Sequence, residues 1–209
     1  MRKPTRAAQQ TLIIESIYPF FAIVSFNSFY ATDCEAQIKR LRKRTKGKRL
    51  TKKQKIELSN LIGDARTSSI IAVVFAVTAL EHAIYRYALR RLSHEFFVKH
   101  LDRLSLLAKW LVIPKLVTGK ALEESDSAMS SLRELIATRN DLVYAKARVG
   151  DIASRKDADR MFKRSMQQEP TISKCAASAP KIVERVVRLL EKIDPCDDVS
   201  KIVHDTLQE

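Results

Sequence analysis

Residues that break or cross-link a chain are scarce in this protein. Its 209 residues include only 4 Gly, 6 Pro and 3 Cys, while Ala, Leu, Ile, Lys, Arg and Glu are abundant. Because helix formers dominate and few turns interrupt them, the composition predicts an all-α fold. The cysteines, Cys34, Cys175 and Cys196, lie far apart without CxxC spacing, which argues against a disulfide framework or a zinc site. We therefore expect reduced cysteines, a cytoplasmic location, and no metal or other cofactor.

Long apolar runs are also missing. The two best candidates, residues 12–26 and 69–80, are shorter than the roughly 20 residues that a membrane-spanning helix needs, and the first contains Glu15 and Pro19. We expect neither a secretory leader nor a membrane partner. With 45% hydrophobic residues the chain can build one core, so a single helical domain is expected over 1–209. Its central helix should contain 69–80, buried on more than one side.

Hydrophobic periodicity predicts where the first helices lie. Two long helices are expected, one over 8–43 and one from a Thr51 cap to about Leu92, joined by a basic loop at 43–52. Shorter helices are expected within 95–118 and over about 126–148. The second long helix should turn an apolar stripe toward the core: Val73, Val77, Leu80, Ile84 and Tyr87.

The last quarter of the chain divides into a polar part and an apolar part. Residues 151–178 are poor in apolar side chains, so we expect an irregular and mobile connector there. Pro180 suits the first turn of a helix, so we expect the C-terminal helices within 179–209. In total the pattern predicts an antiparallel bundle of four to five main helices.

One stretch without any acidic residue is crowded with cations. The net charge of the chain is +14, and 11 basic residues between positions 39 and 56 account for most of it, leaving +3 elsewhere. Such a segment can hold phosphates, so we expect RNA binding there; a solvated loop, a membrane face and a localisation signal are the other interpretations. The basic residues are Lys39, Arg40, Arg42, Lys43, Arg44, Lys46, Lys48, Arg49, Lys52, Lys53 and Lys55.

An arginine stands where the helix of 126–148 should present an apolar side chain. At 100° per residue, Arg139 lands in the apolar arc that includes Leu135 and Val143, while Thr138 falls on the opposite, polar side. A guanidinium in an apolar seam requires a carboxylate, a phosphate or an open interface. It could form an internal ion pair with Glu81, or it could face a second copy of the chain across a cleft that receives a phosphodiester.

The string RNDLVYAK, which begins at Arg139, resembles the signature region of HEPN domains. In that motif an arginine and a polar residue precede a histidine that follows after four to six positions. Here Asn140 is the polar residue, and Tyr144 occupies the histidine position after a spacing of four. The segments FAVTALEHAIYRY and KWLVIPKLVTGK also resemble the family, so the similarity covers about residues 65–150.

This resemblance implies an HEPN-like homodimer with the motif helices at its interface, and often a metal-independent ribonuclease of a toxin–antitoxin or phage-defence system. Arg139 would hold the scissile phosphate, Asn140 would bond it or orient a neighbour, and Glu81 would match the acidic position of the upstream helix. Tyr144 would replace the catalytic histidine. A phenol with a pKa near 10 is a much weaker base at neutral pH than an imidazole with a pKa near 6.5.

Three functions follow from these patterns. The first is an RNA-directed HEPN-like protein, either an endoribonuclease or a catalytically degenerate RNA-binding relative, with RNA, a second copy and an antitoxin protein as partners. The second is a non-catalytic helical dimerisation or interaction module whose basic loop binds an acidic partner. DNA binding is the third and has least support, because no base-reading helix-turn-helix is apparent.

Overall fold

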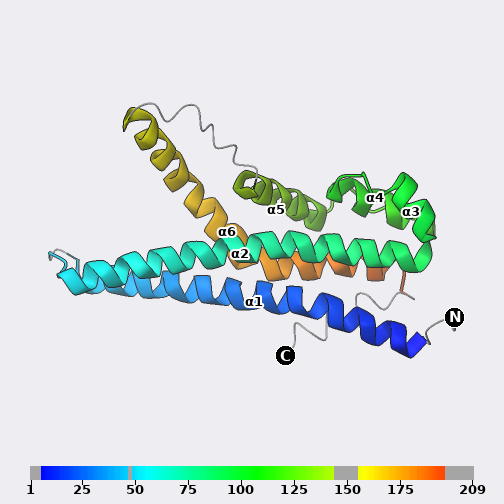
Figure 1. The fold of residues 1–209 in the computed structure, drawn as a ribbon, viewed down its shortest axis with the longest axis horizontal. Helices are drawn as coiled ribbons and strands as arrows, with labels where there is room; N and C mark the ends of the chain where they lie inside the picture. Colours follow the sequence, from blue (N-terminus) through cyan, green and yellow to red (C-terminus); the bar gives the residue numbers. More distant parts are fainter. Residues whose placement is uncertain (1–5, 47–48, 144–154, 196–209) are drawn as a thin grey trace.

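The described part of the chain is entirely helical, which confirms the expected all-α class. The structure, a computed structural model, describes residues 6–46, 49–143 and 155–195, with side chains for 19–46, 49–143 and 169–195. The chain order of the helices is visible in Figure 1. They are α1 (Arg6–Arg44), α2 (Lys52–Arg91), α3 (His94–His100), α4 (Leu106–Thr118), α5 (Ser127–Val143) and α6 (Arg155–Ile193).

Helix α2 is the centre of the molecule and packs against each of the other five helices (Figure 1). The predicted stripe from Val73 to Tyr87 is confirmed, since its five members are at most 1% exposed. Small residues extend this burial to other sides of the helix, because an alanine lets a neighbouring backbone approach closely. These fully buried alanines are Ala72, Ala76, Ala79, Ala83 and Ala88.

Helices α1 and α2 form one long antiparallel hairpin. The Phe20 ring lies 6.2 Å from that of Phe75 and 5.7 Å from that of His82, so the first half of α1 meets the second half of α2. The predicted cap at Thr51 is confirmed: its hydroxyl accepts from the Gln54 amide at 3.2 Å, and the Gln54 side chain accepts from the Thr51 amide at 3.0 Å. Both helices therefore remain regular close to the turn.

Short connections place α3, α4 and α5 on another side of α2 (Figure 1). Ser93 caps α3 and Ser105 caps α4 through their hydroxyl groups. Gly119 ends α4 in the left-handed conformation, with φ of 75°, which glycine adopts at no steric cost. Asp126 begins α5 by accepting from the Ala128 amide at 2.7 Å. The expected boundaries near 118 and 126 are confirmed.

The expectation of an irregular segment over 151–178 is wrong for the residues that the structure describes, because α6 is helical from Arg155. Pro180 does not open a helix either; both Pro170 and Pro180 lie inside α6. A proline removes one backbone donor and tends to bend a helix without always ending it. In Figure 1, α6 changes direction between its yellow first part, which points away from the hairpin, and its orange second part, which lies against α2.

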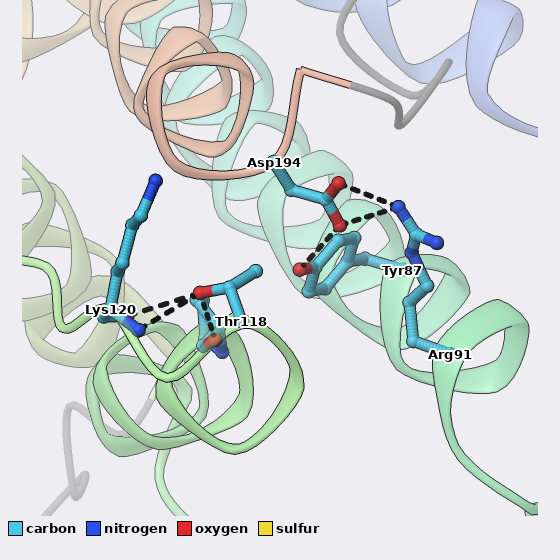
Figure 2. A network of polar contacts seen from close by, with 6 residues as sticks. Tyr87, Arg91, Thr118, Lys120 and Asp194 are labelled. Atoms are coloured by element: carbon cyan, nitrogen blue, oxygen red, sulfur yellow. Dashed lines mark hydrogen bonds and ion pairs between the residues drawn. The ribbon is translucent and has the colours of Figure 1, made fainter.

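The second half of α6 supplies the apolar face that its sequence predicts. Its buried side chains include Ile182, Val183, Val186, Val187 and Leu190. Just beyond this helix, the Asp194 carboxylate is 92% buried and accepts two bonds of 2.6 Å from one Arg91 amino group and one of 3.1 Å from the Tyr87 hydroxyl (Figure 2). Because a buried carboxylate is costly without partners, this cluster fixes the ends of α2 and α6 against one another.

Helix α2 also meets the length and composition criteria for a membrane span, and no other helix of the described residues does. However, 56% of its most apolar window is buried inside the protein, and the core helix of a helical bundle satisfies the same criteria. By length and composition alone, α2 is therefore only weak evidence for a membrane span.

Replacing Asp194 by alanine should lower the free energy of unfolding by about 2 kcal/mol, because it removes the charge-assisted hydrogen bonds from Arg91 and the hydrogen bond from the buried Tyr87 hydroxyl. Urea denaturation followed by circular dichroism measures the loss. The matched control, Lys192→Ala, changes an exposed neighbour on α6 and should shift stability by less than about 0.5 kcal/mol. Equal effects of the two substitutions would contradict a role for the Asp194 cluster.

Candidate nucleic-acid interface

The predicted basic loop forms the tip of the α1–α2 hairpin. We define the basic tip as the cations between Lys39 and Lys55; Lys48 lies outside the described residues. In Figure 1 this blue-to-cyan end of the hairpin extends past α5 and past the start of α6. All ten described cations are exposed: Lys39, Arg40, Arg42, Lys43, Arg44, Lys46, Arg49, Lys52, Lys53 and Lys55.

Only a thin apolar contact supports the hairpin below this tip. Cys34, Ile38 and Ala65 are buried there, with Leu58 and Leu61 packed against them. Because this contact is separate from the main core, the end of the hairpin stands out as a rod of two helices. The cations on its outer surfaces are open to solvent and can reach a large ligand.

Helix stability does not explain the charge of the basic tip. Cations at the end of α1 are favourable beside the negative end of its dipole, and its last turn holds Arg42, Lys43 and Arg44. The same argument has the opposite sign at the start of α2, whose first turn contains Lys52 and Lys53 and no acidic residue. Bringing like charges together at one turn adds repulsion. A polyanion would relieve both costs.

The second predicted site lies on α5. Met129, Leu132 and Leu135 are fully buried. Arg139 follows in the same arc and is half-buried, and it takes part in a polar or electrostatic interaction. Two side chains of α5 do not lie where the spacing of 100° per residue predicts. Thr138 is buried beside Cys175 of α6, and its hydroxyl also donates to the Glu134 carbonyl within α5 at 2.9 Å. Val143 is 53% exposed, although Leu142 beside it packs against the core.

Glu81 forms an ion pair with Lys109 and not the predicted pair with Arg139. The Glu81 carboxylate is half exposed and lies 3.9 Å from the ammonium group of Lys109 on α4. Lys109 itself is buried, and it also lies 3.9 Å from Asp102 and 5.8 Å from the centre of the Phe97 ring. These contacts fasten α4 to α2. The sequence does not single out Lys109, because one lysine in an apolar run resembles any surface lysine.

Helix directions also separate Glu81 from Arg139. Glu81 lies six residues before the α2 tyrosine that contacts Asp194, so it is level with the part of the parallel helix α6 near Arg188, about one turn after Arg185. Arg185 donates to the Ser131 hydroxyl at 3.0 Å, in the first half of α5. Arg139 lies eight residues further along α5, or about 12 Å at 1.5 Å per residue. The structure therefore does not bring these two predicted site residues together.

The other members of the predicted motif are only partly visible. Asn140 is exposed beside Arg139, so its amide is open to a ligand. Tyr144 lies outside the described residues, and its position relative to Arg139 stays a prediction. Among the described residues, no three His, Cys, Asp or Glu side chains form a group that could hold a metal ion.

His82, the histidine nearest in sequence to the predicted Glu81 site, faces α1 rather than α5. Its ring lies 5.7 Å from the Phe20 ring, and partial burial together with the charge of Arg86 lowers its pKa. The Cys34 and Cys175 thiols are buried and free, and burial raises the pKa of each. None of the three therefore supplies an activated nucleophile or an imidazole beside Arg139.

The sequence interpretation overlooked a group of exposed aromatic side chains on α1. We define the aromatic face as Phe26, Phe29 and Tyr30, which are 65%, 73% and 39% exposed. The Phe26 and Tyr30 rings lie nearly parallel, 6.1 Å apart with an interplanar angle of 5°. Their spacing of three and four residues was a visible signal, but the apolar run before them suggested that they belong to the core.

Stability should depend on pH through His82. Its pKa is lower in the folded protein, so the unfolded chain binds the proton more readily. The contribution of His82 to the free energy of unfolding is therefore present at neutral pH. It is lost as the pH falls through the pKa of the unfolded state, about 6.5, and stops changing below the pKa of the folded state. Urea denaturation between about pH 7.5 and pH 5.5 should show a smaller decrease for His82→Gln than for the wild type. The exposed-site control His94→Gln should retain the wild-type decrease, and an unchanged His82→Gln profile would contradict the assignment.

Comparison with known proteins assigns no family to the chain. No protein-family model matches it, and neither a curated protein nor a solved structure does. What the interface binds must therefore follow from the chemistry of its own residues.

Proposed function

We propose that this protein is an RNA-directed, HEPN-like helical protein that holds the RNA backbone at its basic tip. The observation that carries the proposal is the exposure of all ten described cations at one projecting turn, in a stretch without an acidic residue. Lysine and arginine contacts to phosphates supply most of the non-specific affinity for nucleic acids, because each contact releases condensed counterions. The tip concentrates this chemistry at one end of the molecule.

Any RNA cleavage would take place at residues of α5. Arg139 would contact a phosphate at an interface between two copies of the chain, and Asn140 would donate to the same group. The half-burial of Arg139 supports this role, because part of its side chain remains accessible to a ligand. Glu81 is not part of this site, since its carboxylate lies 3.9 Å from the ammonium group of Lys109 on α4. An antitoxin protein would be the natural partner of such a toxin-like ribonuclease.

The competing proposal is a non-catalytic interaction module whose basic tip binds an acidic protein. The distance along α5 between Arg139 and the level of Glu81 favours it, because the acidic position implied by the HEPN resemblance is not beside the arginine. The two proposals share the basic tip but differ in the ligand and in whether a bond is cleaved.

Binding of a single-stranded RNA should weaken with salt. If about five tip cations contact phosphates, the plot of log affinity against log salt has a slope near −3.5. The double variant Arg44→Glu and Lys52→Glu should reduce the magnitude of that slope by about 1.4, because two contacts are lost. Fluorescence anisotropy at several salt concentrations measures both values.

The control for this experiment has the same net charge. Lys115→Glu and Lys181→Glu alter exposed lysines on α4 and α6, away from the tip, and should leave the slope unchanged. If the affinity of the wild type did not depend on salt, or if the two double variants reduced the slope equally, the basic tip would not be the phosphate-binding site.

RNA cleavage in EDTA distinguishes the ribonuclease from the interaction module. We expect Tyr144→His to cleave RNA faster than the wild type, because a neutral imidazole accepts a proton at pH 7 and general acid–base catalysis is worth about 10²- to 10⁴-fold. Adding Arg139→Ala to that variant should abolish the gain, whereas Lys181→Ala should not. Absence of cleavage in every variant, with RNA binding intact, would leave an RNA-binding protein without a nuclease site.

A further inference from the structure

We propose that the aromatic face of α1 is a stacking surface for unpaired bases, so that the ligand of the basic tip is single-stranded RNA. The inference rests on the proposed RNA binding and specifies its substrate class. It combines two features of one helix, the exposed rings of Phe26, Phe29 and Tyr30 and the cations that follow them.

The exposure of these rings has no role in folding. Phe21 and Val24 of the same helix are at most 1% exposed and supply its contact with the core, whereas Phe29 is 73% exposed. A cluster of exposed aromatic groups indicates an interaction site, whereas a single exposed apolar residue does not. The near-parallel rings of Phe26 and Tyr30 offer flat π surfaces, which is the geometry that a base requires for stacking.

The aromatic face and the basic tip are continuous along α1. Five turns of an α-helix contain 18 residues, so Arg44 lies directly in line with Phe26, and Arg40 lies on the same face one turn earlier. Tyr30 and Arg40 are separated by ten residues, or about 15 Å along the axis. A single extended strand can therefore place its phosphates at the tip and its bases on the rings.

Acidic groups beside the rings determine which part of the ligand can lie there. Asp33 is on the same face and accepts a bond of 2.7 Å from the Gln37 side chain. The charge of Asp64 on α2 is the main reason that the pKa of Tyr30 is raised, followed by Cys34, so its hydroxyl remains protonated at neutral pH. Carboxylates repel phosphates but tolerate neutral bases, which favours phosphates at the tip and bases at the aromatic face.

Unpaired bases fit this surface better than a duplex or a second copy of the chain. A duplex keeps its bases stacked internally and has no free base face to offer to a protein ring. A stable homodimer buries about 800 Å² on each partner, whereas three partly exposed rings supply at most about 400 Å². The adjoining cations would also repel one another if two such faces met.

The test compares RNA binding by ring variants of the full chain. The probes are a labelled oligouridine of about 12 nucleotides and a duplex of the same length, measured by anisotropy. Phe29→Ala and Phe29→Leu should each weaken oligouridine binding by about 5- to 20-fold, and Phe29→Trp should preserve it, because stacking requires a π system. Phe96→Ala, which removes an exposed aromatic group of α3, is the matched control and should have no effect.

The possible results separate this inference from the proposed function. Loss of oligouridine binding in Phe29→Ala and Phe29→Leu, with duplex binding unchanged, supports the stacking surface. Equal binding of all ring variants, with salt-dependent binding retained, overturns the stacking surface and leaves RNA binding at the tip. A wild type that binds neither probe overturns both. If Phe29→Ala instead shifts a dimer to a monomer in sedimentation while RNA binding persists, the aromatic face contacts a second copy and the inference is wrong.

Discussion

The burial of α2 is the constraint on which the rest of the structure depends. A helix that contacts five others must be apolar around its circumference and narrow enough for close approach, and the alternation of alanine with valine, leucine and isoleucine between positions 72 and 84 meets both needs. The two polar ends of α2 have different structural roles. Its C-terminal end is held by the Asp194 cluster, while its N-terminal end continues past the core and forms half of the basic tip.

Projection of the hairpin beyond the core explains why its charge can be kept. Ten described cations at one turn repel one another, and the start of α2 adds an unfavourable dipole interaction. Because this turn rests on a small contact of its own, around Cys34 and Ile38, the electrostatic cost does not disturb the packing of the main core. A charged ligand can then approach from several directions without a change in the bundle. This arrangement is typical of a binding surface added to a stable scaffold.

On α5 the physical argument concerns a long cationic side chain near the end of an apolar arc. Arg139 lies in the arc, as its spacing from Leu132 and Leu135 predicts, and it is half-buried there, while Leu142 in the last turn still packs against the core. A half-buried arginine can pack its methylene groups against apolar neighbours while its guanidinium takes part in a polar interaction. The separation from Glu81 changes the proposed site, because the carboxylate at the position that the HEPN resemblance suggests lies beside Lys109 instead.

The sequence by itself determined the helical class, the Thr51 cap, the end of α4 at Gly119 and the apolar faces of α2 and α6, because capping and periodicity are local properties of the chain. It also located the cations of the basic tip. It did not predict that α6 begins at Arg155, because the polar composition of 151–178 and the position of Pro180 indicated an irregular segment followed by a new helix, whereas α6 continues through Pro170 and Pro180. Only the tertiary structure decided which partner each charge finds and which aromatic side chains stay in water. Glu81 faces Lys109, Asp194 joins Arg91, and Phe29 is left uncovered, since these outcomes depend on how helices distant in sequence are placed around α2.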